Sequence, residues 1–303
     1  IKKPFISLSL ELDGKTSDIF TAGAGENIGG RINWTNNLPN RITDLEITAR
    51  FMGKFDRLTV RASNGFYRSI DDTIVWNKTT DDKLSIIGPD ESGSVSFTFN
   101  PLTTSALVYS GSRGHEINVE IGVKAKRLSD LNVPEEITSS ITRLIRLNSD
   151  IGLLGHSLYF TGPFSNQGPI PPTVEENTTY TVVWSLSNTI NNLADVKVRA
   201  PLPTYVAWVG TVSPSSEKVN YDNLTNEIIW DVGNLSAGAG FSLPRREVAF
   251  QVSVLPSLSQ IGNSPTILGS AYVSGVDRFT QEVVKASARE ISTVIQDAFM
   301  YSG

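Results

Sequence analysis

Apolar and polar residues alternate with a period of two along most of this chain. In the first half, alternating rows cover residues 6–12, 45–51, 58–62, 95–99 and 117–125. In the second half, they cover residues 180–186, 196–200, 228–232, 248–254 and 267–273. Successive side chains of a strand point to opposite faces, so each row predicts a strand with one buried face. No stretch keeps a helical period over three turns, and we expect an all-β protein.

Turn residues separate these rows. Asp13-Gly14 follows the first row and Asn64-Gly65 follows the third. An Asn-Gly pair between apolar rows is a strong hairpin signal because both residues tolerate a positive φ. We therefore expect a β-hairpin at Asn64-Gly65. Short strands at intervals of about ten residues, with turns between them, are typical of a β-sandwich or barrel.

The second half of the chain repeats the first. Matched positions lie 150 to 154 residues apart and include Trp34 with Trp184, Trp76 with Trp230, and Phe97 with Phe250. Every matched segment alternates, so the duplicated unit is a core of strands and not a catalytic loop. We expect two tandem β-sandwich domains, residues 1–149 and 150–303, of which the first is a diverged copy. The link between them has no flexible Gly/Ser tract, which favours a fixed relation between the domains.

Composition narrows the class of protein. The chain has 303 residues, a formal net charge of −5 and no cysteine. It has no basic run longer than a dipeptide, so we expect no nucleic-acid partner. Because cysteine is absent, we expect no disulfide and no thiolate metal site. No segment reaches the roughly 18 consecutive apolar residues of a spanning helix. The chain begins at Ile1 and not at Met, which we interpret as a mature or fragmentary exported protein.

Four segments of the second half carry a family resemblance. They are TTYTVVWSLSN (residues 178–188), LPTYVAWVGTVSP (202–214), YDNLTNEIIWDVGNLSAG (221–238) and REVAFQVSVLPSLSQIG (246–262). Together they resemble the Ig-like repeat modules, known as domains of unknown function, of large bacterial and archaeal cell-surface proteins. The segment GPFSNQGPIPP (162–172) resembles a subgroup from uncultivated, ultra-small bacteria. The resemblance implies Ig-like β-sandwiches, an extracellular location at the cell surface, and structural or adhesive work.

Residues with reactive side chains are few. His115 and His156 fall in different domains, so neither domain has a two-histidine metal site, and we expect both to be surface or edge residues. The carboxylate pairs Asp71-Asp72, Asp81-Asp82 and Asp90-Glu91 fall in expected turns and lack the spacing of a calcium loop. We interpret them as solvated turns and expect no catalytic residue, metal or organic cofactor.

Four of the five tryptophans are expected to be core anchors. Trp34, Trp76, Trp184 and Trp230 recur pairwise on the apolar phase of strands, where a large aromatic buries over about 150 Å². Trp208 has no counterpart in the first half and is the better candidate for an exposed contact.

Residues 296–303 contain an apolar group, Ala-Phe-Met-Tyr at 298–301. Leaving Ala-Phe-Met-Tyr in water costs free energy, and sheet edges accept extended peptides. We therefore expect Phe299 and Tyr301 to dock on an adjacent subunit or a neighbouring surface protein, and a frayed terminus is the alternative.

These observations predict a non-enzymatic, extracellular structural protein. It would associate with copies of itself as a subunit or stalk of a cell-surface layer or filament. The alternative is an adhesin-type module that recognises a host glycan or protein.

Overall fold

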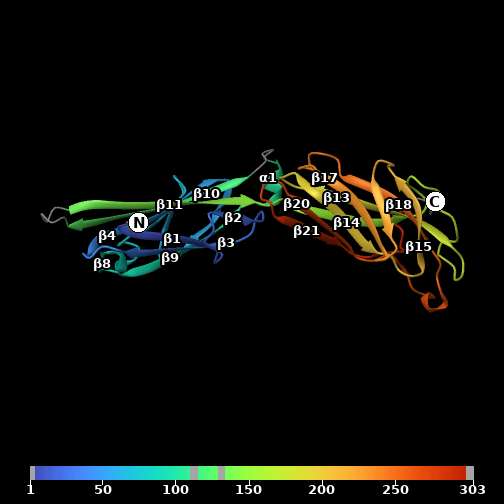
Figure 1. Cartoon of the computed structure of the whole chain (residues 1–303), viewed down its shortest axis with the longest axis horizontal. Coiled ribbons are helices and arrows are strands. Elements are labelled where there is room, and N and C mark those ends of the chain that lie inside the picture. The colour runs from blue at the N-terminus through green and yellow to red at the C-terminus, as the bar shows by residue number, and fades with distance from the viewer. Residues whose placement is uncertain (1–3, 110–114, 129–133, 298–303) are drawn as a thin grey trace. The chain divides into compact units, whose positions relative to one another are not determined.

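The computed structural model describes residues 4–109, 115–128 and 134–297. The chain divides into two compact units, residues 1–148 and 149–303. Each unit is a sandwich of two main β-sheets (Figure 1). The all-β prediction is confirmed. Within the described residues, helix is confined to α1 (Thr104–Tyr109) and to two 3₁₀ turns, Asp82–Leu84 and Leu258–Gln260.

Unit 1 pairs a four-stranded sheet with a larger one. The first sheet has the order β1-β3-β9-β5, and the second has the order β2-β11-β10-β4-β7-β6, with β8 on β4. The strands are β1 (Ile6–Leu12), β2 (Ile19–Ala22), β3 (Ile28–Asn36), β4 (Ile42–Gly53), β5 (Phe55–Ala62), β6 (Phe66–Arg68), β7 (Thr73–Trp76), β8 (Ile86–Ile87), β9 (Ser92–Pro101), β10 (Glu116–Leu128) and β11 (Pro134–Leu147). All pairings are antiparallel except that of β2 with β11.

Unit 2 has sheets of four and five strands and a short third ladder. Their orders are β12-β13-β18-β15, β16-β17-β14-β20-β21 and β19-β22. The strands are β12 (Ile151–Leu158), β13 (Thr178–Asn188), β14 (Leu193–Pro201), β15 (Val206–Ser213), β16 (Lys218–Asp222), β17 (Glu227–Leu235), β18 (Arg246–Val254), β19 (Thr266–Leu268), β20 (Ala271–Asp277), β21 (Val283–Ala288) and β22 (Ile291–Ser292).

The strand orders explain the sequence repeat. The sheet β1-β3-β9-β5 corresponds strand for strand to β12-β13-β18-β15, and the run β6-β7-β4-β10-β11 corresponds to β16-β17-β14-β20-β21. Trp34 and Trp184 lie on the equivalent strands β3 and β13, and Trp76 and Trp230 lie on β7 and β17. The duplicated sequence therefore encodes the same sandwich twice.

The predicted hairpin at Asn64-Gly65 is wrong. Asn64 does adopt a left-handed backbone with φ 50°, and the chain turns there. However, β5 before the turn pairs with β9, whereas β6 after it pairs with β7 of the other sheet. The turn therefore carries the chain from one layer of the sandwich to the other.

The four repeated tryptophans lie in the cores, as predicted. Trp76, Trp184 and Trp230 are fully buried, and Trp34 is nearly so. In unit 2 the rings of Trp184 and Trp230 stack with centroids 6.5 Å apart, and Phe250 packs edge-on against Trp184 at 4.8 Å. In unit 1 the ring of Phe97 packs near Trp76, with the two ring centroids 6.4 Å apart.

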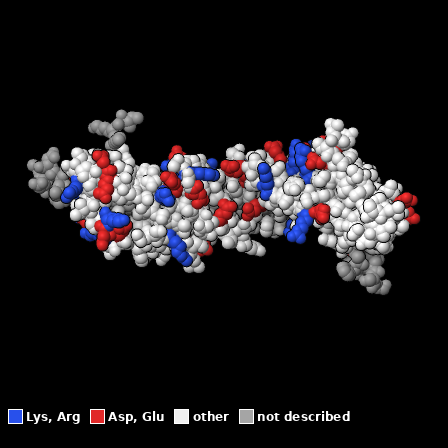
Figure 2. Space-filling model, turned by 90° about the horizontal axis from the view of Figure 1, so that it is seen from below, with Lys and Arg blue, Asp and Glu red and all other residues white. Residues whose placement is uncertain are grey.

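No helix in the described part of the chain has the length and apolar character needed to cross a membrane. In Figure 2, charged side chains of both signs are mixed over the left and middle of the face, and the right-hand end is largely free of them.

Candidate functional site

The connection between β12 and β13 crosses the outer face of the first sheet of unit 2. Residues 162–172, which we call the strap, include Asn166, whose side-chain amide donates to Tyr159 O at 3.0 Å and to Thr181 Oγ1 at 3.0 Å. The Gln251 amide donates to Asn166 Oδ1 at 3.0 Å. Thr181 and Gln251 face outward from the core, yet both are buried. The strap therefore covers this part of the sheet.

A glycine allows the strap to approach β13 closely. Gly168 has φ 101°, and a Cβ at this position would lie 2.3 Å from Asn177 O. On either side of it, Thr179 N donates to Gln167 O at 2.8 Å and Thr178 Oγ1 donates to Pro169 O at 3.1 Å. The segment singled out in the sequence therefore has a defined structural role.

Beyond the strap, three separate segments enclose a groove of about 860 Å³. They are Phe160 with the end of the strap and the residues that follow it, the loop after β18, and the stretch after β22. The lining, which we call the groove, consists of Phe160, Ile170, Pro171, Pro172, Thr173, Val174, Pro256, Gln260, Ile261, Gly262, Asn263, Ser264, Pro265, Thr293, Val294 and Ile295.

The groove is apolar, uncharged and exposed. None of its lining residues is charged, and four are prolines, whose fixed φ makes the walls stiff. Ile261 is 65% exposed and Val294 is 66% exposed. No acid, base or thiol lines the groove, so its chemistry is that of binding an uncharged, largely apolar partner.

A buried carboxylate fixes the chain at the rim of the groove. Asp297 is 4% exposed. It accepts hydrogen bonds from the backbone N–H groups of Phe160 and Thr161 at 2.8 and 2.7 Å, and from Thr161 Oγ1 at 2.9 Å. Tyr159 N donates to the same carboxylate at 3.2 Å. Phe160 belongs to the groove, so the Asp297 clasp joins the groove wall to the end of the described chain.

The clasp lowers the pKa of Asp297. Burial on its own would raise this pKa, but the hydrogen bonds from Thr161, Tyr159 and Phe160 together outweigh it. Because the folded-state pKa is the lower one, the ionised carboxylate contributes stability that is fully present above the unfolded value of 3.8. That contribution is lost as the pH falls below 3.8 and through the folded-state pKa.

We expect Asp297→Asn to destabilise unit 2 by about 1.5–3 kcal/mol at pH 7, because hydrogen bonds to a charged group are lost. The difference from the unsubstituted chain should shrink at pH 3, below the unfolded value of 3.8, where the contribution of the ionised carboxylate is being lost. Urea unfolding of both chains at the two pH values measures this. An equal difference at both would contradict a role for the charge.

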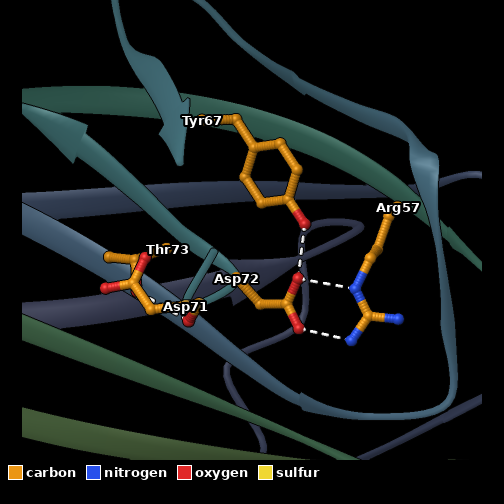
Figure 3. A network of polar contacts seen from close by, with 5 residues as sticks. All are labelled: Arg57, Tyr67, Asp71, Asp72 and Thr73. Carbon is orange, nitrogen blue, oxygen red and sulfur yellow. Dashed lines mark hydrogen bonds and ion pairs between the residues drawn. The ribbon is translucent and has the colours of Figure 1, made fainter. Parts of the chain in front are cut away.

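A network of polar side chains lies at the β6–β7 hairpin of unit 1 (Figure 3). Tyr67 Oη donates to Asp72 Oδ1 at 2.8 Å, and Arg57 pairs with the same carboxylate through two N–H groups at 2.8 and 2.6 Å. The neighbouring Asp71 pairs with Arg68. The hydrogen bond from Arg57 holds the pKa of Asp72 below its usual value. Burial, followed by the hydrogen bond to Asp72, raises the pKa of Tyr67 to about 12.

Unit 2 repeats the central contact of this network. Tyr221 donates to Asn226 Oδ1 across the β16–β17 hairpin, 154 residues after Tyr67 and Asp72. Asp72 and Asn226 both have a left-handed backbone, with φ of 53° and 57°. A feature built twice at the same turn, with a carboxylate in one copy and an amide in the other, serves to hold the hairpin and not to do chemistry.

Exchanging these two residue types tests that interpretation. We expect Asp72→Asn to cost unit 1 less than about 1 kcal/mol, because it removes only an ion pair with the half-exposed Arg57. Asp72→Ala should cost about 2 kcal/mol, since it also loses the Tyr67 bond and places alanine in a left-handed backbone. Thermal unfolding of both variants measures this, and equal losses would contradict it.

The other paired carboxylates also have structural partners. Asp81 Oδ1 accepts from Lys83 N at 3.1 Å and caps the 3₁₀ turn, and Glu91 accepts from Gly88 N at 2.6 Å. Among the described residues, no three His, Cys, Asp or Glu side chains gather as a metal-binding group.

The two histidines differ from each other. His115, expected at the surface, is 5% exposed. His115 lies two residues before Ile117 and so faces the core with Ile117, Val119 and Ile121 of β10. This alternation in the sequence could have predicted that His115 is buried. His156 lies on the edge strand β12, as expected, and burial lowers its pKa against the opposing charges of Glu247 and Asp297. The nearby Ser185 hydroxyl donates directly to Glu247. In a Ser-His-acid triad the serine would instead donate to the histidine, so these three residues are not arranged as a triad.

Two of the three assembly candidates, Phe299 and Tyr301, lie outside the described residues. The third, Trp208, is the only one of the five tryptophans that is not buried. Its ring packs on Phe250 with the ring centroids 5.6 Å apart, so it presents only part of its surface on the edge strand β15.

The clasp also changes where the tail begins. Gln296 N donates to Ser157 O at 3.0 Å, so Gln296 and Asp297 belong to the fold and the tail begins at Ala298.

A second opening, about 530 Å³, lies on the sheet β1-β3-β9-β5. Its lining includes the polar side chains of Glu11, Asp13, Arg31, Arg61, Ser96 and Thr98, with Gly29 between Asp13 and Thr98, and also Ala62 and Phe97. We call this opening the polar trough.

Comparisons with known proteins find similarity among solved structures. No protein-family model and no curated protein matches the chain. Among solved structures, the C-terminal domain of the Streptococcus pyogenes antigen I/II-family protein AspA is similar over 94% of this chain and 99% of that one, at 9% identity and TM-score 0.34.

Two further structures match about half of the chain. The seventh ScaB type I cohesin from Pseudobacteroides cellulosolvens matches 55% of this chain and 100% of its own length, at 12% identity and TM-score 0.30. A GH20 exo-β-N-acetylglucosaminidase from Vibrio harveyi matches 46% of this chain but 18% of its own length, at 13% identity and TM-score 0.23. At such scores these similarities carry no argument about function.

Proposed function

We propose that this chain is a non-enzymatic extracellular structural protein that associates with copies of itself, as a subunit or stalk of a cell-surface layer or filament. The observation that carries the proposal is the groove of unit 2. It is an exposed, uncharged, apolar opening of about 860 Å³ with stiff walls. Exposed apolar patches of this kind mark contact sites for other molecules, and no acid or base lines this one.

The tandem repeat supports the same proposal. A sandwich copied once, with its strand order kept in both sheets, extends a chain without adding a reactive centre. We propose that the tail, residues 298–303, makes the contact between copies through Phe299 and Tyr301, and that Trp208 on β15 is a further candidate contact.

Negative-stain electron microscopy of the purified chain tests this function. Regular layers or filaments would support it. A field of separate single molecules under all conditions would contradict it.

The polar trough favours the alternative of an adhesin-type module. Exposed arginines and small polar side chains over a glycine floor suit hydrogen bonding to a glycan. A glycan array probed with the chain and with the double variant Arg31→Ala/Arg61→Ala tests it. Binding that depends on both arginines would favour the adhesin over the self-associating protein.

A further inference from the structure

The groove of unit 2 is an exposed apolar opening with no stated occupant. We propose that it binds the tail of a second copy of the chain, with residues 298–301 (Ala-Phe-Met-Tyr) as the bound segment. This rests on the proposed self-association and names the two surfaces through which it takes place.

The chemistry of the groove selects the occupant. A charged partner would lose its hydration without gaining an opposite charge, because no charged residue lines the walls. An apolar partner instead removes the exposed surfaces of Ile261, Val294 and Phe160 from water. The polar lining residues Gln260, Asn263 and Thr293 leave room for a few hydrogen bonds.

The tail matches these requirements in composition. Residues 298–303 carry no charged side chain and include Phe299, Met300 and Tyr301. Aromatic side chains dominate the energetics of protein contacts, and methionine adapts to irregular apolar walls. Tyr301 adds a hydroxyl that needs a partner when it is buried.

The clasp limits the reach of residues 298–303 within their own copy. Asp297 is fixed against residues 159–161, and a single residue, Ala298, separates it from Phe299. Two Cα–Cα steps span at most about 7 Å, so the clasp bounds how far Phe299 can reach from Asp297. A segment from a second copy has no such bound and can contact every part of the groove lining.

The same clasp predicts the symmetry of the contact. Asp297, the last described residue, is clasped beside its own groove, so two copies placed groove to groove would exchange residues 298–303 reciprocally. A reciprocal contact is two-fold and closes a pair. Layers or filaments would then be built from such pairs through further surfaces.

The experiment uses a labelled peptide of residues 298–303 and the full chain with Phe299→Ser and Tyr301→Ser, whose own tail cannot compete. Fluorescence anisotropy should show saturable binding. Adding Ile261→Asp or Val294→Asp, both at exposed groove positions, should weaken binding about tenfold or more. The matched control is Leu224→Asp, 92% exposed on the β16–β17 turn of the same unit, which should leave binding unchanged.

Thermal unfolding of every variant ensures that loss of binding is not loss of fold. The proposal would be overturned if the peptide fails to bind, or if the groove substitutions leave its binding unchanged. This holds even if the full chain assembles. A monomeric wild-type chain that excludes the peptide would mean that its own tail fills the groove. That result would overturn both the second-copy occupant and the proposed function.

Discussion

Trp184→Ala or Trp230→Ala should destabilise unit 2 by about 3–5 kcal/mol, the usual cost of deleting a buried large aromatic. Both rings are fully buried and stacked on each other, and Trp184 also packs against Phe250. Either truncation therefore leaves a cavity between the two sheets that the stiff strands around it do not fill. Calorimetric unfolding of the full chain measures the loss.

Trp184→Phe is the matched control. Within the described structure the Trp184 indole N–H has no hydrogen-bond partner, so phenylalanine removes a buried polar group while keeping an aromatic ring. It should cost much less than alanine. Trp230 differs, since its indole donates to Glu217 Oε2 at 2.8 Å. An alanine variant at either position that melts within a degree or two of the unsubstituted chain would contradict the core assignment.

Removing residues 298–303 should abolish self-association and leave the melting temperature of the chain unchanged. The deletion begins after Asp297, so the clasp onto residues 159–161 is kept. The apolar residues proposed to make the contact are lost. Light scattering and thermal unfolding of the same sample separate the two effects.

A longer deletion, residues 296–303, serves as the contrast. It removes the Asp297 carboxylate and the Gln296–Ser157 hydrogen bond, so it should lower stability as well as assembly. If the shorter deletion leaves assembly intact, the tail is not the contact.

The strands and the repeat were predictable because they follow from local periodicity. A period of two places side chains on alternating faces whatever the fold, and the matched tryptophans mark the same strands in both units. The turn at Asn64-Gly65 could be predicted, but the crossing of the chain to the other sheet at that turn could not. Which sheet the next strand joins depends on the distant partner β7, and turn chemistry does not encode it.

The groove could not be predicted from the sequence. Its walls come from residues 160–174, 256–265 and 293–295, and no period links three loops so far apart. Proline and glycine in these loops signalled turns, and their meeting at one end of unit 2 is a result of the fold. Asp297 gave no signal either, because its partners are backbone N–H groups and one threonine hydroxyl, which follow no sequence pattern.

Sedimentation velocity of the full chain over a wide range of concentrations tests the central claim most directly. One chain has a mass of 33.0 kDa. Self-association predicts that the mean mass rises with concentration to at least twice that value, and that Phe299→Ser with Tyr301→Ser holds it at one chain. A wild-type mass that stays at 33.0 kDa at every concentration would contradict the claim.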